Sequence, residues 1–206
     1  MSSLPLLPSC LSRRLGPLLL VGALLVGWGG GAWAQDAAEP GAASLPVVPH
    51  VDLLRYGGLW HEIARLPNSL QRKCVDEVTA EYLPRPSGGM SVVNRCRQQD
   101  GSLDETRGVG RRAAPHEGEA DDAGRLEVRF APIWMAWLPA VWGDYRILAL
   151  DDDYSIALVG TADRSSLWLL ARRPSLPDKE VEAWLARAAA LGFDTSRVIR
   201  SGAAAS

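Results

Sequence analysis

Apolar and polar side chains alternate with a period of two along most of the chain beyond its first quarter. The clearest example is the run Val75–Leu83, in which Val78, Ala80 and Tyr82 fall on one face and acidic or hydroxyl side chains fall on the other. A period of two is typical of a strand with one buried and one exposed face. Pro and Gly clusters, such as the one at residues 84–89, separate these runs and predict turns.

Eight such runs predict eight strands, and no helical pattern lies between any two of them. Parallel strands need long crossover connections, so this order predicts an antiparallel up-and-down sheet. Closing eight strands into a barrel removes exposed sheet edges and leaves an interior wide enough for one small ligand. We therefore predict an all-β, eight-stranded barrel with strands at Leu59–Arg65, Val75–Leu83, Met90–Arg97, Glu105–Ala114, Arg125–Ala131, Gly143–Leu150, Ser155–Gly160 and Ser166–Arg172.

One amphipathic segment follows the strands. Ser175–Asp178 is typical of a helix start, with a proline in the first turn, and Gly192 is typical of a stop. We expect a single C-terminal helix packed outside the barrel, and a short last strand at residues 197–200. The apolar stripe of this helix consists of Val181, Trp184, Leu185, Ala188 and Leu191.

The first 34 residues are typical of an export signal. Two arginines precede an apolar run, and Ala32-Trp33-Ala34 matches a small-x-small cleavage site. The run is shorter than a membrane-spanning helix requires, so we expect cleavage after Ala34 and a soluble product, periplasmic or secreted. Cys10 precedes the run and therefore cannot be a lipoprotein attachment site. We expect a flexible segment at residues 35–50, one domain at 51–200 and a disordered tail at 201–206.

Removal of this signal changes the composition and the charge. It takes away two arginines and no acidic residue, so 172 residues remain and the formal net charge moves from −2 to −4. A chain of this charge lacks the basic footprint of a nucleic-acid-binding protein. The acidic stretch at 115–124 and the turn Asp151–Asp153 are interpreted as solvated turns, so we expect no metal and no cofactor.

Two cysteines remain after cleavage, Cys74 and Cys96. In an exported chain this count predicts one disulfide. A hairpin centred near Arg85 places the two cysteines opposite each other on neighbouring strands. The closed loop predicts a stabilisation of about 3 kcal/mol.

No catalytic motif is visible in the sequence. Neither a Gly-x-Ser-x-Gly elbow nor a His-Glu-x-x-His pair occurs, and His50, His61 and His116 lie outside any catalytic pattern. We therefore expect a binding protein rather than an enzyme.

Three motifs resemble those of the lipocalin family. Gly58-Leu59-Trp60-His61-Glu62-Ile63-Ala64-Arg65 is similar to the G-x-W opening of the bacterial lipocalin and apolipoprotein D branch, although that branch usually has Tyr at the position of His61. The segment beginning Gly143-Asp144-Tyr145 resembles the second lipocalin motif. The segment Leu167–Pro174, which contains Arg172, resembles the third. The resemblance covers residues 51–200.

The resemblance implies a barrel that an N-terminal turn closes at one end. In this family the motif Trp packs at the closed end and the motif Arg lies across it, so Trp60 and Arg172 are expected to be structural residues. The motif residues Gly58, Asp144 and Tyr145 are assigned the same structural role. A guanidinium above an indole contributes about 1 kcal/mol.

Alternation combined with the motifs predicts which side chains face the interior. Such a lining, apolar with a few polar groups, is typical of a small-molecule pocket. The same side chains could instead fill the barrel as packed core, and alternation alone does not distinguish the two. The predicted lining residues are Val78, Ala80, Tyr82, Val92, Asn94, Trp168 and Leu170.

The connection between the fifth and sixth strands carries three tryptophans and no charge. Connections normally face water, so this composition of residues 133–142 is unusual. If the hairpin at residues 87–89 is at the closed end, this segment is at the open end. Three interpretations stay open: a lid over the mouth that places Trp134, Trp137 and Trp142 against the ligand, a membrane contact, or a protein contact.

Two functional hypotheses follow from these patterns and the resemblance. The first is an exported carrier or store of a fatty acid or lysophospholipid, involved in membrane maintenance under stress. The second is a membrane- or protein-docking module that uses residues 133–142 and has a filled barrel.

Overall fold

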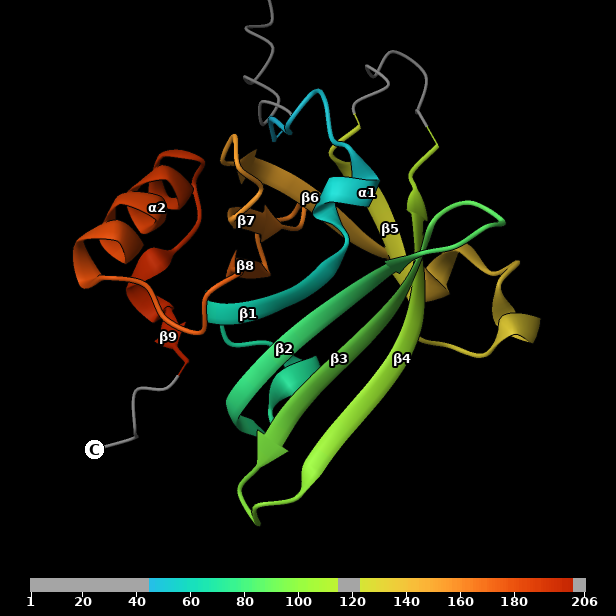
Figure 1. Ribbon diagram of the computed structural model, residues 1–206, viewed down its shortest axis with the longest axis horizontal. Coiled ribbons are helices and arrows are strands. Elements are labelled where there is room, and N and C mark those ends of the chain that lie inside the picture. The colour runs from blue at the N-terminus through green and yellow to red at the C-terminus, as the bar shows by residue number, and fades with distance from the viewer. Residues whose placement is uncertain (1–44, 115–122, 202–206) are drawn as a thin grey trace, which may run out of the picture. The chain divides into compact units, whose positions relative to one another are not determined.

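The computed structural model describes residues 45–114 and 123–201, which belong to one compact unit. Its strands form one antiparallel sheet in the order β2-β3-β4-β5-β6-β7-β8-β1-β9, and β1 also pairs with β2, which closes a barrel of eight strands (Figure 1). The predicted all-β barrel is confirmed. The strands are β1 (Gly58–Arg65), β2 (Cys74–Pro84), β3 (Met90–Gln98), β4 (Leu103–Arg112), β5 (Arg125–Arg129), β6 (Gly143–Leu150), β7 (Ile156–Gly160), β8 (Leu167–Ala171) and β9 (Ile199–Arg200).

Each of the eight predicted strands is present, and the largest differences are at the ends of β4 and β5. β5 ends at Arg129, two residues before the predicted end. Pro132 follows closely, and proline cannot donate a hydrogen bond to a sheet. The short strand β9 pairs with β1 at Ala64 and Arg65 rather than extending the barrel.

The helices of the described residues are α1 (Leu53–Tyr56), α2 (Asp178–Ala190) and four short 3₁₀ turns, η1 (Ser69–Gln71), η2 (Ile133–Met135), η3 (Pro139–Val141) and η4 (Thr195–Arg197). α1 begins after Asp52, whose carboxylate accepts the backbone N–H of Leu54 at 2.8 Å. α2 begins directly after Pro177 and ends before Gly192, which has φ +88°. None of the helices in these described ranges is long and apolar enough to cross a membrane.

Two hydrophobic clusters lie on opposite sides of the barrel wall. The outer cluster packs Val181, Trp184 and Ala188 of α2 against the outside of β1, β7 and β8. The inner cluster lies inside the barrel and contains Trp60, Tyr82 and ten other buried apolar residues, nine of which belong to α1, β3, β5, β6, β7 and β8. The predicted helical stripe therefore packs outside the barrel (Figure 1).

The disulfide Cys74–Cys96 is present with a Cα–Cα distance of 5.5 Å, but the predicted register is wrong. The hairpin is centred on residue 87, as the pair Tyr82↔Val92 shows, and Cys74 pairs with Gln98 rather than with Cys96. Two irregularities in β2, between residues 74 and 79, shift the pairing. The two cysteines are therefore diagonal neighbours on adjacent strands, which still lie within disulfide reach.

The end of the segment predicted to be flexible is packed on the barrel. Leu45 is buried in the outer cluster, and the Val48 backbone N–H donates to the Ile147 carbonyl at 2.9 Å. The predicted signal at residues 1–34, most of the acidic stretch and the tail after Ser201 lie outside the described residues.

Candidate ligand-binding site

The closed end of the barrel is built around Arg172 and Trp60. The Arg172 guanidinium carbon lies 3.9 Å from the centre of the Trp60 ring. Its nitrogens donate to the carbonyls of Leu59 at 2.8 Å and Gly57 at 2.7 Å, among others. Gly58 has φ +93°, and a Cβ atom there would lie 3.3 Å from Arg172 Nη1. The motif glycine therefore supplies both the backbone conformation and the room that the arginine needs.

Three tyrosines form a hydrogen-bonded chain above this base. The Tyr145 hydroxyl lies 2.7 Å from that of Tyr56 and 2.9 Å from that of Tyr82. Burial raises the pKa of Tyr82 to about 12 and raises the pKa values of Tyr56 and Tyr145 well above their usual value. The neighbouring motif residue Asp144 points outward, where it pairs with Arg146 at 3.0 Å. Tyr145 of the motif Gly143-Asp144-Tyr145 thus lies in the inner core, and the adjacent Asp144 lies on the outer face of the barrel.

The structure places most of the predicted lining residues together. Tyr82, Val92 and Leu170 are buried in the inner cluster, and Ala80 and Trp168 pack against it. The cavity beside the tyrosines measures about 10 Å³, which is room for at most one water molecule. The barrel is therefore closely packed beside the tyrosines, and contact of the predicted lining side chains with a ligand stays a prediction.

Two other predicted lining residues lie outside that cluster. Val78 is buried, and the Asn94 side-chain oxygen Oδ1 is buried without a hydrogen-bond partner in the described part of the chain. Buried polar atoms normally have a partner, so Asn94 offers an unused acceptor.

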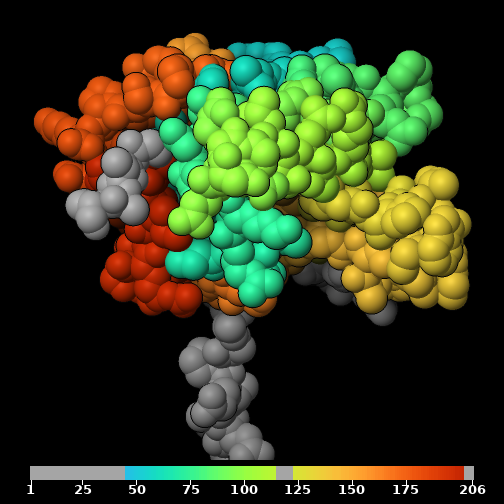
Figure 2. All heavy atoms as spheres, turned by 90° about the horizontal axis from the view of Figure 1, so that it is seen from below, coloured from blue at the N-terminus to red at the C-terminus, as the bar shows by residue number. Residues whose placement is uncertain are grey.

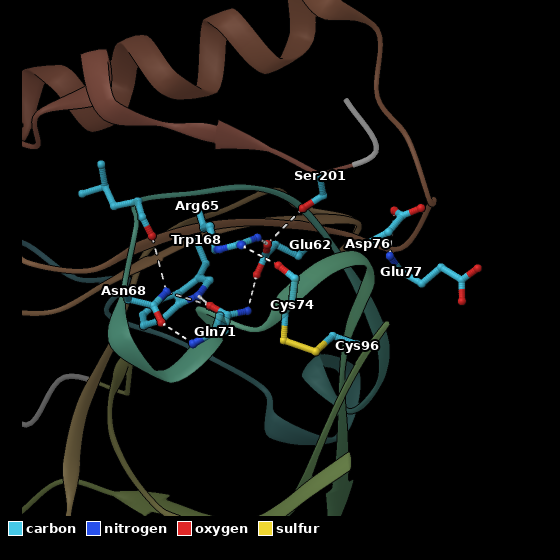
Figure 3. A network of polar contacts seen from close by, with 11 residues as sticks. Glu62, Arg65, Asn68, Gln71, Cys74, Asp76, Glu77, Cys96, Trp168 and Ser201 are labelled. Carbon is cyan, nitrogen blue, oxygen red and sulfur yellow. Dashed lines mark hydrogen bonds and ion pairs between the residues drawn. A yellow bond between two sulfur atoms is a disulfide. The ribbon is translucent and has the colours of Figure 1, made fainter. Parts of the chain in front are cut away.

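A buried polar network spans the open end of the barrel (Figure 3). Glu62 and Arg65, only 4% and 7% exposed, pair at 2.6 Å. Gln71, on the β1–β2 connection, donates to Glu62 at 2.6 Å and accepts the Trp168 indole N–H at 2.8 Å. Ser201 also donates to Glu62, at 2.9 Å. Since Gln71 bonds to side chains of β1 and β8, the η1 turn is held across the mouth.

The sequence reasoning missed this network. Glu62 lies two residues after Trp60 on the same strand, so strand alternation could have predicted that its side chain points inward. Arg65 is different, because strict alternation from residue 60 points position 65 outward. A register shift between Glu62 and Ala64 reverses the parity. The Nε atom of Arg65 is buried without a hydrogen-bond partner among the described residues.

The tryptophan-rich segment 133–142 does not cover the mouth. Figure 2 looks onto the open end, where teal residues occupy the middle and the yellow segment stands at the side. Trp134 and Trp137 are 71% and 77% exposed, so neither lines the barrel. Trp142 lies on the outer face of the wall, where the guanidinium carbons of Arg111 and Arg129 are 3.7 and 5.2 Å from its ring centre. The structure thus differs from the lid interpretation, because outward arginines at the base of the segment hold it against the side of the barrel.

The barrel, its closed end and its external helix define a class of small-ligand-binding β-barrel proteins. Residues 51–203 match the family model described as a lipocalin-like domain, and the chain belongs to the lipocalin family. The outer membrane lipoprotein Blc of Escherichia coli K12 is 36% identical over 153 residues, which cover 74% of this chain and 80% of the relative. Temperature-induced lipocalin-1 of Arabidopsis thaliana is 32% identical over 75% of this chain and 80% of the relative. Apolipoprotein D of Macaca fascicularis is 28% identical over 80% and 84%.

Solved structures agree with this fold. Insecticyanin from the tobacco hornworm Manduca sexta matches with a TM-score of 0.57 and 22% identity, over 76% of this chain and 83% of that one. Lobster apocrustacyanin A1 matches with a TM-score of 0.53 and 16% identity, over 79% and 92%. The predicted family is confirmed, and with it the broad class: a lipocalin that binds a small hydrophobic ligand and is not an enzyme.

Proposed function

We propose that this protein carries or stores one fatty acid or lysophospholipid inside its barrel. The observation that carries the proposal is the inner lining, in which Val92, Leu170 and the ring of Trp168 meet in one apolar cluster. Burial of an acyl chain against such a surface contributes roughly 25 cal/mol per Å², before the cost of ordering the chain. The head group lies near the mouth, where polar side chains gather.

An acyl chain that reaches the three tyrosines requires the packing there to open, because the cavity beside them measures about 10 Å³. We propose that the η1 turn moves when a ligand enters, since it lies at the mouth and, among the described residues, only the Gln71 side chain bonds it to side chains of both β1 and β8. The proposed contacts with the chain are Val78, Ala80, Tyr82, Val92, Asn94, Trp168 and Leu170. The exposed Trp134 and Trp137, and Trp142 on the outer face, are removed from this set.

We also propose that the protein is exported and soluble after cleavage, and that it serves membrane maintenance under stress. The apolar run before Ala34 supports export, and the position of Cys10 ahead of that run speaks against lipid attachment. The relatives named outer membrane lipoproteins support a place near a membrane, and the temperature-induced relative supports a stress role.

A fluorescence titration with oleate tests the carrier function. Trp168 lies at the mouth, and Trp184 lies outside the barrel on the buried face of α2. We expect a saturable change in the wild type that Trp168→Phe removes and Trp184→Phe keeps. Lipid extraction and mass spectrometry of each purified variant measures binding independently of fluorescence. No copurified lipid together with no response to oleate would overturn the carrier function.

A second candidate function is membrane contact through residues 133–142. The exposure of Trp134 and Trp137 favours it, because indole rings prefer the interface between lipid and water. Flotation with phosphatidylcholine vesicles tests this contact. The double variant Trp134→Ser, Trp137→Ser should lose vesicle binding and keep oleate binding, and equal flotation of both proteins would contradict the contact.

A further inference from the structure

A groove of about 170 Å³ opens in the barrel wall near the open end. The pairing of β4 with β5 stops at Val109↔Arg129, where β5 ends and the chain turns toward η2. β4 extends beyond this pair toward the open end, so the two segments separate. The groove is lined by Arg107, Gly108, Val109, Arg129, Ala131 and Ile133.

Arg129 is a buried cation that forms no ion pair within the described part of the chain. Its residue exposure is 5%, and within the described ranges no carboxylate forms an ion pair with it. One terminal nitrogen donates to the Ala131 carbonyl, and Nε has no hydrogen-bond partner among the described residues. Buried charges in proteins are normally paired, since an isolated one is costly. A group that completes this site must therefore accept hydrogen bonds and carry negative charge.

The carboxylates that share the outer face of these two strands with Arg129 are already engaged. Glu127 pairs with Arg111 at 2.8 Å. Glu105 pairs with Arg107 at 2.6 Å and with Arg95 at 2.8 Å. The Arg107 side chain is 69% exposed at the outer edge of the groove, so it has donors left for a second partner. The groove thus offers one deep and one outer guanidinium to an incoming anion.

The walls of the groove suit the head of an amphiphile. Gly108 allows the chain after β5 to approach β4 closely, because a Cβ atom there would lie 2.7 Å from both the Arg129 carbonyl and the Phe130 ring. Ile133 adds an apolar edge that faces water. It also begins the turn η2, which carries the exposed Trp134, so the cationic groove and the aromatic segment are continuous along the chain.

We propose that this groove binds the phosphate group of an anionic membrane lipid, with Arg129 as the deep ligand and Arg107 as the outer one. Guanidinium groups match phosphate oxygens in a two-point geometry. The groove faces out of the barrel, so the bilayer surface can present the phosphate while Ile133, Trp134 and Trp137 enter the interface. This inference rests on the proposed membrane contact and adds its lipid specificity; it is independent of the ligand inside the barrel.

The test is flotation of the mature protein with two kinds of vesicle, phosphatidylcholine alone and phosphatidylcholine with a fifth of the lipid replaced by phosphatidic acid. We expect the wild type to prefer the second kind. The preference for vesicles with phosphatidic acid should be at least about fivefold weaker in Arg129→Met than in the wild type. It should fold, because an apolar replacement removes an unpaired buried charge. Arg107→Met, at an exposed position, tests the outer ligand without touching the buried side chain.

Arg173→Met is the matched control, since Arg173 is also exposed but follows β8 at the closed end. It should keep the preference. Equal binding of the wild type to both vesicles, or an unchanged preference in Arg129→Met, overturns the phosphate site and leaves the membrane contact standing. Failure of the wild type to float with either vesicle overturns the contact itself. A last experiment measures the binding of soluble lysophosphatidic acid. If Arg129→Met loses this binding but floats with vesicles as the wild type does, the site belongs to the carried ligand, and the membrane assignment is overturned.

Discussion

Replacement of Arg172 by methionine should open the closed end of the barrel. The charged guanidinium of Arg172 donates hydrogen bonds to several backbone carbonyls. Nη1 donates to the Leu59 carbonyl at 2.8 Å, and Nη2 donates to the carbonyls of Gly57 at 2.7 Å and Arg55 at 2.9 Å. Its guanidinium also covers the Trp60 ring. Burial lowers the pKa of Arg172 from its high ordinary value, and the group stays protonated at neutral pH.

The magnitude follows from these contacts. Hydrogen bonds to a charged group contribute about 1.5–3 kcal/mol each, and the cation–π contact adds about 1 kcal/mol. Arg172 is partly exposed and its bonds share donors, so we count two bonds at the lower value. With the cation–π contact, the expected loss in the free energy of unfolding is about 4 kcal/mol. Arg172→Lys should recover less than half of it, because an ammonium group cannot reach the carbonyls on both sides.

The assay is urea unfolding followed by far-ultraviolet circular dichroism, since fluorescence of Trp60 changes with the mutation itself. The neighbouring Arg173 provides the control. It forms one exposed ion pair with Glu180 at 3.1 Å, so Arg173→Met should cost less than about 0.5 kcal/mol. The reasoning is refuted if Arg172→Met is as stable as Arg173→Met.

Three further predictions concern the hairpin, the core and the mouth. Replacing Cys74 and Cys96 by serine should lower the free energy of unfolding by about 3 kcal/mol in the same urea assay, and an unchanged midpoint would contradict the loop-closure argument. The raised pKa of Tyr82 means that stability is full below pH 10 and falls by about 3 kcal/mol as the pH passes 12; in Tyr82→Phe, alkaline titration should show a smaller loss. Gln71→Ala should speed the association of oleate in stopped flow, because it releases the η1 turn. The control Arg72→Ala, at the adjacent exposed position, should leave the rate unchanged. Equal rates in the two variants would show that Gln71 does not hold the η1 turn closed.

The barrel could be predicted from the sequence because its signals are local. Alternation within each strand, and turn residues between strands, fixed the strand order and the interior parity of Tyr82, Val92 and Leu170. The four-residue helix α1 was not predicted from the pattern, since one turn is too short to show a helical period.

Local irregularities within strands could not be predicted from the alternation of apolar and polar residues. The hairpin is centred two residues later than predicted, and the shifts in β2 move the partner of Cys74 from residue 100 to Gln98. The shift in β1 turned Arg65 toward Glu62. A single extra residue reverses the face of everything after it, and no composition signal marks its position. The polar network at the mouth was therefore hidden from the sequence.

The orientation of the tryptophan-rich segment depends on long-range packing. Its apolar composition suggested a lid, but the position of Trp142 is set by Arg111 and Arg129 on strands that precede the segment. Their outward parity could have been read from the alternation of β4 and β5. Their contact with the indole of Trp142, which follows Arg129 by 13 residues and Arg111 by 31, could not be predicted from that alternation.

Native mass spectrometry of the mature protein tests the central claim most directly. The protein would be purified from an exporting host without detergent and measured alone and after addition of oleate. One acyl chain should bind per barrel, so we predict a single added mass that matches one fatty acid or lysophospholipid and that oleate displaces in a one-to-one ratio. A spectrum of the bare chain that oleate leaves unchanged would contradict a carrier function.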